Sequence, residues 1–234
     1  LQTALSQRID EATWMSAATK AQAKDKLENF IIKIGYPDKW KDYSGLQVDD
    51  SLSLYENMAN ISEFFTKDAI ARKVNKPVDK TEWGMTPQTI NAYYNPTTNE
   101  ICFPAAILQP PFFDPTADDA MNYGGIGGVI GHEMSHGFDD QGSQFDKTGN
   151  QHNWWTAADK KNFESRTKIL VDHFNKIELA GKKVNGQMTL GENIGDNGGL
   201  NIAFRALQNV MKTEKLGVKD GFTPEQRFFL AWAR

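Results

Sequence analysis

The chain of 234 residues carries 26 Lys and Arg against 30 Asp and Glu, which gives a formal net charge of −4. This mildly acidic balance contains no run of five like charges and gives no reason to expect a nucleic-acid partner. The longest apolar stretches, such as Ile101–Leu108, fall far short of the ~20 residues that span a membrane. A single cysteine, Cys102, excludes an internal disulfide and a cysteine-rich zinc site, and its apolar neighbours predict a small buried side chain.

The first 80 residues show mainly helical patterns. Ser16 is expected to cap a helix that runs through Asn29 to Ile34. Asp49 or Asp50 is expected to cap a second helix, whose apolar residues recur at helical spacing. These apolar residues are Leu52, Tyr55, Met58, Ile61, Phe64 and Phe65. The polar segment that follows is interrupted by prolines and predicts a connector over residues 74–87.

From residue 89 the pattern changes to that of strands. Residues 89–94 and 100–103 predict two strands, joined by the turn-rich segment between them. Three helices are expected next, at residues 118–138, 156–175 and 190–213. Thr223 followed by Pro224 predicts the start of one more helix. That helix is still building an apolar face at Arg234, so we expect the chain to be a fragment of a longer protein.

The pattern His-Glu-x-x-His at residues 132–136 is the strongest chemical signal in the chain. Residues four apart on a helix lie within ~40° of each other, so His132 and His136 form a chelating pair for Zn²⁺. Glu133 lies ~100° away, where it can act as general base on a metal-bound water. The alternative, two surface histidines on a polar helix, is disfavoured by the apolar Val129 and Ile130.

Five glycines precede this motif, and each costs a helix ~1 kcal/mol relative to alanine. A helix that carries so many is expected to lie close to another backbone. They are Gly124, Gly125, Gly127, Gly128 and Gly131.

A catalytic zinc needs a third protein ligand and one open position. Asp139 and Gly142 stand where the metzincin pattern requires glycine and histidine, so that class is excluded. Among the downstream carboxylates, only Glu192 has an aspartate, Asp196, four residues on and on the same helical face. One acid can bind the metal while the other orients a ligand histidine, and Asp139 and Asp140 are further candidates for this orienting role. The alternatives are ordinary acids at the start of one helix and the end of another.

At this point the chain resembles the neprilysin and endothelin-converting-enzyme family of zinc metallopeptidases. Residues 129–140 resemble the family's active-site helix, and residues 190–200 resemble its third-ligand helix. The family usually has alanine in place of Gly195. Residues 91–94 look like its substrate-clamping edge strand, and residues 103–113 are also similar.

The resemblance implies that His132, His136 and Glu192 bind one Zn²⁺ per chain and that Glu133 activates water. It implies that Asp196 orients a zinc histidine and assists proton transfer. Asn91 and the backbone of Ala92 would hold a peptide substrate as an added strand. For Asn91 the alternative is a turn-forming asparagine beside a hairpin.

The expected fold is mainly helical α+β of the zincin (gluzincin) type, with a small sheet beside the His-Glu-x-x-His helix. Residues 1–80 are expected to form a helical segment leading into the catalytic domain. Residues 81–234 are expected to form the zincin catalytic domain, truncated at its C-terminal end.

These observations predict a zinc-dependent endopeptidase that cleaves small peptides by attack of a zinc-bound water. The family's oxyanion-stabilising histidine and substrate-binding arginine would lie beyond Arg234, so this fragment is expected to be weakly active or inactive. The alternatives are a non-catalytic zinc- or peptide-binding module and another zincin such as an aminopeptidase. No signal peptide is visible at Leu1–Ser6; the resemblance implies an extracytoplasmic location, with a membrane tether outside this chain.

Overall fold

The computed structural model describes residues 1–234, which form two compact units. One unit contains Leu1–Tyr36 and Met85–Arg234, and the other contains Pro37–Gly84. This grouping differs from the expected division between residues 80 and 81. The first 36 residues belong with the later part of the chain because they pack against its helices and pair with its sheet.

The smaller unit contains helix α3, Leu54–Lys73. This helix was predicted, but the prediction that Asp49 or Asp50 caps it is wrong. Ser53 caps the helix, since its hydroxyl accepts from the Glu56 amide and the Glu56 carboxylate accepts from the Ser53 amide. Asp49 instead accepts the amide of Ser51 in a local turn. The predicted connector over residues 74–87 contains neither helix nor strand, as expected.

The larger unit begins with helices α1, Gln2–Glu11, and α2, Ala17–Glu28. Ser16 caps α2 as predicted, but the helix does not reach Ile34. It ends at Glu28, and residues Ile31–Gly35 form strand β1. The apolar run after α2 is therefore a strand, and its pairing with a strand some 70 positions later along the chain overrides the local helical pattern.

A three-stranded sheet has the order β1–β3–β2, with β2 at Tyr93–Asn95 and β3 at Glu100–Pro104. The central strand β3 runs parallel to β1 and antiparallel to β2, and it is buried along its whole length. Ile101 and Phe103 of β3 pack in the same core cluster as Met134 of the helix that carries the histidines. Cys102 is fully buried, which confirms its prediction as a small buried side chain.

The predicted helix over 118–138 is two helices, α4 at Asp119–Gly124 and α5 at Ile126–His136. They break at Gly125, where a methyl group would lie 2.4 Å from the carbonyl oxygen of Phe112, and that oxygen accepts the amide of Ile126 at 2.7 Å. A short 3₁₀ turn, Ala105–Ile107, follows β3, and another, Gly142–Gln144, follows α5.

The remaining helices agree with the expected ranges within a few residues. They are α6 at Ala157–Phe174, α7 at Leu190–Val210 and α8 at Pro224–Trp232. Thr223 caps α8, with Pro224 at the first helical position, as predicted. A small hairpin of β4, Glu178–Leu179, and β5, Lys182–Lys183, joins α6 to α7.

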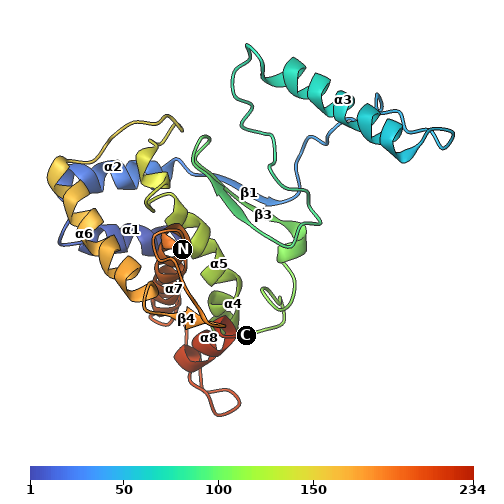
Figure 1. Cartoon of the computed structure of the whole chain (residues 1–234). Helices are drawn as coiled ribbons and strands as arrows, with labels where there is room; N and C mark the ends of the chain where they lie inside the picture. Colours follow the sequence, from blue (N-terminus) through green and yellow to red (C-terminus); the bar gives the residue numbers. More distant parts are fainter. The chain divides into compact units, whose positions relative to one another are not determined.

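Helices α5 and α7 lie side by side (Figure 1), and their backbones touch through glycines. A methyl group added to Gly131 of α5 would lie 2.6 Å from the carbonyl oxygen of Gly199 of α7. The close approach that the glycine-rich helix predicted is therefore present. The mainly helical α+β fold with a small sheet beside α5 is confirmed.

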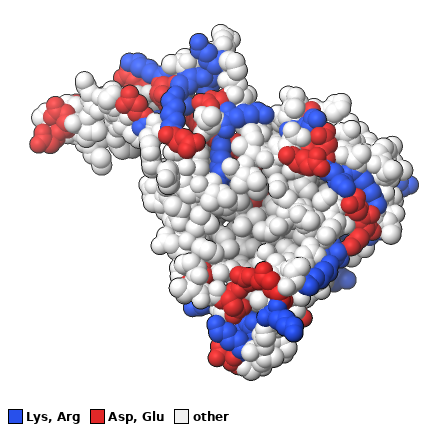
Figure 2. Space-filling view, turned by 180° about the vertical axis from the view of Figure 1, so that it is seen from behind, with Lys and Arg blue, Asp and Glu red and all other residues white.

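On the face shown in Figure 2, lysines and arginines lie among aspartates and glutamates, so that face has no extended area of one sign. No helix in the structure combines the length and apolar character that a membrane span requires.

Candidate metal centre

His132 and His136 project from the same face of α5, one turn apart. Their Nε2 atoms lie 2.9 Å apart, and the two rings meet edge to face with centroids separated by 4.5 Å. Both side chains are largely buried. The helical spacing of the motif therefore produces the converging pair of imidazoles that it predicted.

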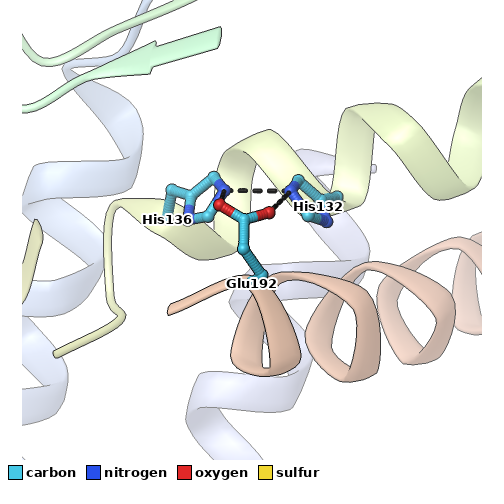
Figure 3. A group of neighbouring side chains, drawn as sticks. All are labelled: His132, His136 and Glu192. Carbon is cyan, nitrogen blue, oxygen red and sulfur yellow. Dashed lines mark hydrogen bonds and ion pairs between the residues drawn. The ribbon is translucent and has the colours of Figure 1, made fainter. Parts of the chain in front are cut away.

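Glu192, in the first turn of α7, completes the group (Figure 3). Its carboxylate oxygens lie 3.4 Å from Nε2 of His132 and 3.9 Å from Nε2 of His136. All three donor groups lie within 4.8 Å of one another. The side chain of Glu192 is 71% exposed, so the group opens toward solvent on the α7 side.

The outer nitrogen of each imidazole faces a carboxylate. Nδ1 of His132 lies 2.9 Å from Asp196 Oδ1, and Nδ1 of His136 lies 2.7 Å from Asp139 Oδ2. A carboxylate accepts an N–H, so we infer that both rings carry their proton at Nδ1. Both Nε2 lone pairs then point at each other beside the Glu192 carboxylate. Such an arrangement is repulsive without a cation, and two imidazoles with one carboxylate are the donor set of a catalytic zinc site.

Glu133 is buried beside the two histidines, with 6% of its surface exposed. Burial raises the pKa of its carboxyl, while His132 and His136 act in the opposite direction. Burial also lowers the pKa of His136, but the hydrogen bond and charge of Asp139 outweigh it and leave that pKa raised. A buried carboxyl whose pKa is raised is a stronger base and is suited to accept a proton.

The two candidate aspartates after α5 are in different environments. Asp139 is 5% exposed, and its Oδ1 accepts the amides of Gln141 and Gly142 at 2.8 and 2.6 Å. The turn thus fixes the carboxylate that faces His136. Asp140 has no contact with either histidine; its Oδ1 is buried without a hydrogen-bond partner, near Gly191 at the start of α7.

Asn91 and Ala92 precede the edge strand β2. The Asn91 side-chain oxygen accepts the amide of Ala92 at 2.9 Å, so the side chain covers the backbone group expected to hold a peptide. Ala92 is buried and Asn91 is exposed. A bound peptide would have to replace this local contact.

The glycines on α7 explain how its acids reach the histidines. A methyl group at Gly195 would lie 2.8 Å from the ring of His132, and one at Gly199 would lie 2.5 Å from the backbone nitrogen of His132. The helices approach closely enough for the short side chain of Asp196 to reach Nδ1. Sequence reasoning missed Lys26, whose ammonium contacts the turn after α5, because nothing in the local pattern of α2 distinguishes it from its neighbours.

Comparison with known proteins identifies close similarity over the whole chain. Two models of peptidase family M13 match, one over residues 91–234 and the other over residues 1–37. Neprilysin-11 of Caenorhabditis elegans is 42% identical over 96% of this chain and 28% of its own length. Endothelin-converting enzyme 1 of Rattus norvegicus is 40% identical over 99% of this chain and 31% of its own length.

Solved structures show the same likeness. The crystal structure of Mycobacterium tuberculosis zinc metalloprotease ZMP1 in complex with an inhibitor has a TM-score of 0.95 and 49% identity, covering 99% of this chain and 36% of that one. The crystal structure of PEPO from Lactobacillus rhamnosis has a TM-score of 0.87 and 37% identity, covering 99% and 35%. This chain therefore spans about a third of the length of the relatives it matches.

Proposed function

This chain belongs to peptidase family M13, and we propose that it supplies the zinc-binding and water-activating centre of an endopeptidase that cleaves small peptides. The family membership confirms the resemblance to neprilysin and the endothelin-converting enzymes. The observation that carries the proposal is the convergence of His132, His136 and Glu192 within 4.8 Å. A buried glutamate, Glu133, stands beside them.

In this proposal His132, His136 and Glu192 would hold one Zn²⁺, which when bound supplies a Lewis acid that polarises a carbonyl and lowers the pKa of water. Glu133 takes a proton from the attacking water and returns it to the leaving amine. Burial raises the pKa of its carboxyl, which makes the carboxylate a better acceptor of the water proton, and the protonated carboxyl can then pass that proton to the more basic leaving amine. Asp196 and Asp139 hold the two imidazoles in the tautomer that leaves Nε2 free.

The peptide substrate would lie along strand β2 in an extended conformation. β2 pairs with β3 on one side only within the three-stranded sheet, so its other edge is where a peptide strand would add. Asn91 would release the amide of Ala92 and use its own carboxamide on the peptide backbone. Asp139 contacts His136 and would orient it, whereas Asp140 has no contact with either histidine.

Family membership also supports an extracytoplasmic location, periplasmic, cell-surface or secreted, for the whole protein. We further propose that the 234-residue chain by itself turns over weakly or not at all. A site that lacks one oxyanion donor typically loses ~10²–10³-fold in rate. We therefore expect that this chain can bind zinc without cleaving peptides at an appreciable rate.

The test uses the 234-residue chain and a longer form that covers the length of the relatives. Bound zinc and cleavage of an internally quenched peptide are measured in each, with Glu133→Gln and, as a matched control, the exposed Glu164→Gln. We expect Glu133→Gln to keep its zinc and to lose ~10²–10⁴-fold in cleavage, while Glu164→Gln changes neither.

Three results would contradict the proposal. A longer form that binds zinc and cleaves no peptide would instead identify a zinc- or peptide-binding module without catalysis. Cleavage unaffected by Glu133→Gln would remove Glu133 from the reaction. Release of a free amino-terminal residue, in place of internal cleavage, would favour an aminopeptidase.

A further inference from the structure

Lys26 is a fully buried lysine in the middle of the larger unit, with 1% of its surface exposed. It projects from α2 toward the segment that follows α5. Its Nζ donates to the carbonyl oxygens of Gly137, Gly142 and Phe145 at 2.7, 2.6 and 2.7 Å. An ammonium has three N–H groups, and each of them meets one acceptor.

The surroundings of Lys26 act on its positive charge in opposite directions. The rings of Tyr94, Phe138 and Trp154 have their centroids 5.7–5.9 Å from Nζ. The carboxylates of Asp139 and Asp146 add favourable charge, although burial has the larger effect and lowers the pKa of Lys26 to about 7. Position matters too, because Gly137 caps the C-terminal end of α5, where a positive charge stabilises a helix.

A short chain of hydrogen bonds links Lys26 to a zinc-binding histidine. The carbonyl of Gly142 accepts from Lys26, and the amide of the same residue donates to Asp139 Oδ1 at 2.6 Å. The other oxygen of Asp139 faces His136 Nδ1 at 2.7 Å. Any displacement of Gly142 therefore displaces the carboxylate that orients His136.

We propose that Lys26 is a positioning residue of the metal centre, whose ammonium gathers the carbonyls of the 137–145 turn and so fixes Asp139 against His136. The inference rests on the proposed zinc site. Lys26 touches neither metal ligands nor substrate, so it acts through Asp139. A lysine that only supported the fold would not be coupled to Asp139 in zinc binding.

The first measurement is the zinc dissociation constant of the 234-residue chain, by competition with a chelator, in the wild type and in Lys26→Met. The visible absorption of the Co²⁺-substituted protein reports the ligand geometry in the same variants. We expect Lys26→Met to weaken zinc by ~10–100-fold, the usual effect of losing an outer partner of a metal ligand, and to alter the Co²⁺ spectrum. Lys24→Met is the matched control, since Lys24 lies on the same helix and pairs with Asp10 at the surface; we expect it to change neither.

The second measurement is a double-mutant cycle with Asp139→Asn. If Lys26 acts through Asp139, Lys26→Met adds little to the loss already caused by Asp139→Asn. Additive losses would overturn the inference, and so would a folded Lys26→Met that binds zinc within twofold of the wild type. Circular dichroism and cooperative unfolding verify that each variant is folded.

Lys26→Gln keeps two donors and serves if Lys26→Met does not fold. Failure of both variants to fold also overturns the inference, because Lys26 would then support the fold as a whole. A wild-type chain that binds no zinc is a different result: it refutes the proposed metal centre itself, and the role of Lys26 with it. The two failures are thus distinguished by the wild type alone.

Discussion

Substitution of Gly131 by alanine is expected to separate the two helices that build the proposed metal centre. A methyl group there would lie 2.6 Å from the carbonyl oxygen of Gly199 and 2.8 Å from its Cα. Both atoms are backbone, so no side-chain rotation can relieve the contact. Carbon atoms pack at about 3.5–4.0 Å, so α7 must move away from α5 by roughly 1 Å.

Two opposing effects decide the stability of this variant. Alanine favours the helix over glycine by about 1 kcal/mol, and overpacking typically costs about 1–3 kcal/mol. We therefore expect a net loss of up to about 2 kcal/mol in the free energy of unfolding. The effect on zinc affinity should be larger than the effect on stability. Metal–ligand distances tolerate a change of only about 0.2 Å, and Glu192 moves with α7. The loss in affinity should reach at least the ~10–100-fold that accompanies disturbed outer partners.

Gly127→Ala is the matched control for this experiment. Gly127 lies on the same helix, but a methyl group there meets the carbonyl oxygen of Asn122 at 3.3 Å and the ring of Tyr123 at 3.6 Å, both on the α4 side. It gains the same helical preference without moving α7. Urea unfolding and chelator competition give the two quantities in each variant. A Gly131→Ala protein that binds zinc as tightly as Gly127→Ala would refute the argument that glycine contact sets the ligand geometry.

Two further predictions concern buried groups. Hydroxyl groups of Ser16 and of two threonines donate to Asp159 and hold the pKa of its carboxyl below its ordinary value. This stabilisation is present above the unfolded pKa of about 3.9 and is lost as the pH falls below it. The urea midpoint of the wild type should therefore drop with acid, and it should drop less steeply in Asp159→Asn. The exposed Asp172→Asn is the control, and its midpoint should drop as steeply as that of the wild type. Burial raises the pKa of Cys102 to about 11, so a thiol reagent at pH 8 should modify it only after unfolding; rapid modification of the folded chain would contradict its burial.

The parts of the site that local geometry determines could be predicted from the sequence. The spacing of His132 and His136 requires only a helix, and the same holds for Glu192 and Asp196. The glycines of α5 also predicted a neighbouring backbone, because their unfavourable effect on helix stability needs a compensating contact.

Features that depend on distant parts of the chain could not be predicted. Residues 31–35 continue a helical pattern, and only pairing with β3 makes them a strand. Asp139 and Asp140 were equivalent in the sequence, and the turn that donates two amides to Asp139 separates them. Lys26 is one of several lysines on α2, and its three acceptors lie 111 to 119 positions away.

The two histidines of the proposed zinc site are oriented by carboxylates that lie in different surroundings. His136 is oriented by Asp139, which is buried and held by its own turn. His132 is oriented by Asp196, which is 61% exposed and belongs to α7, as does the exposed Glu192. Contacts in the interior are screened less than exposed ones, so the contact of Asp139 with His136 is the stronger of the two. In the proposed peptidase centre, this arrangement would fix the ligand geometry on one side and leave the other side open to solvent for a peptide.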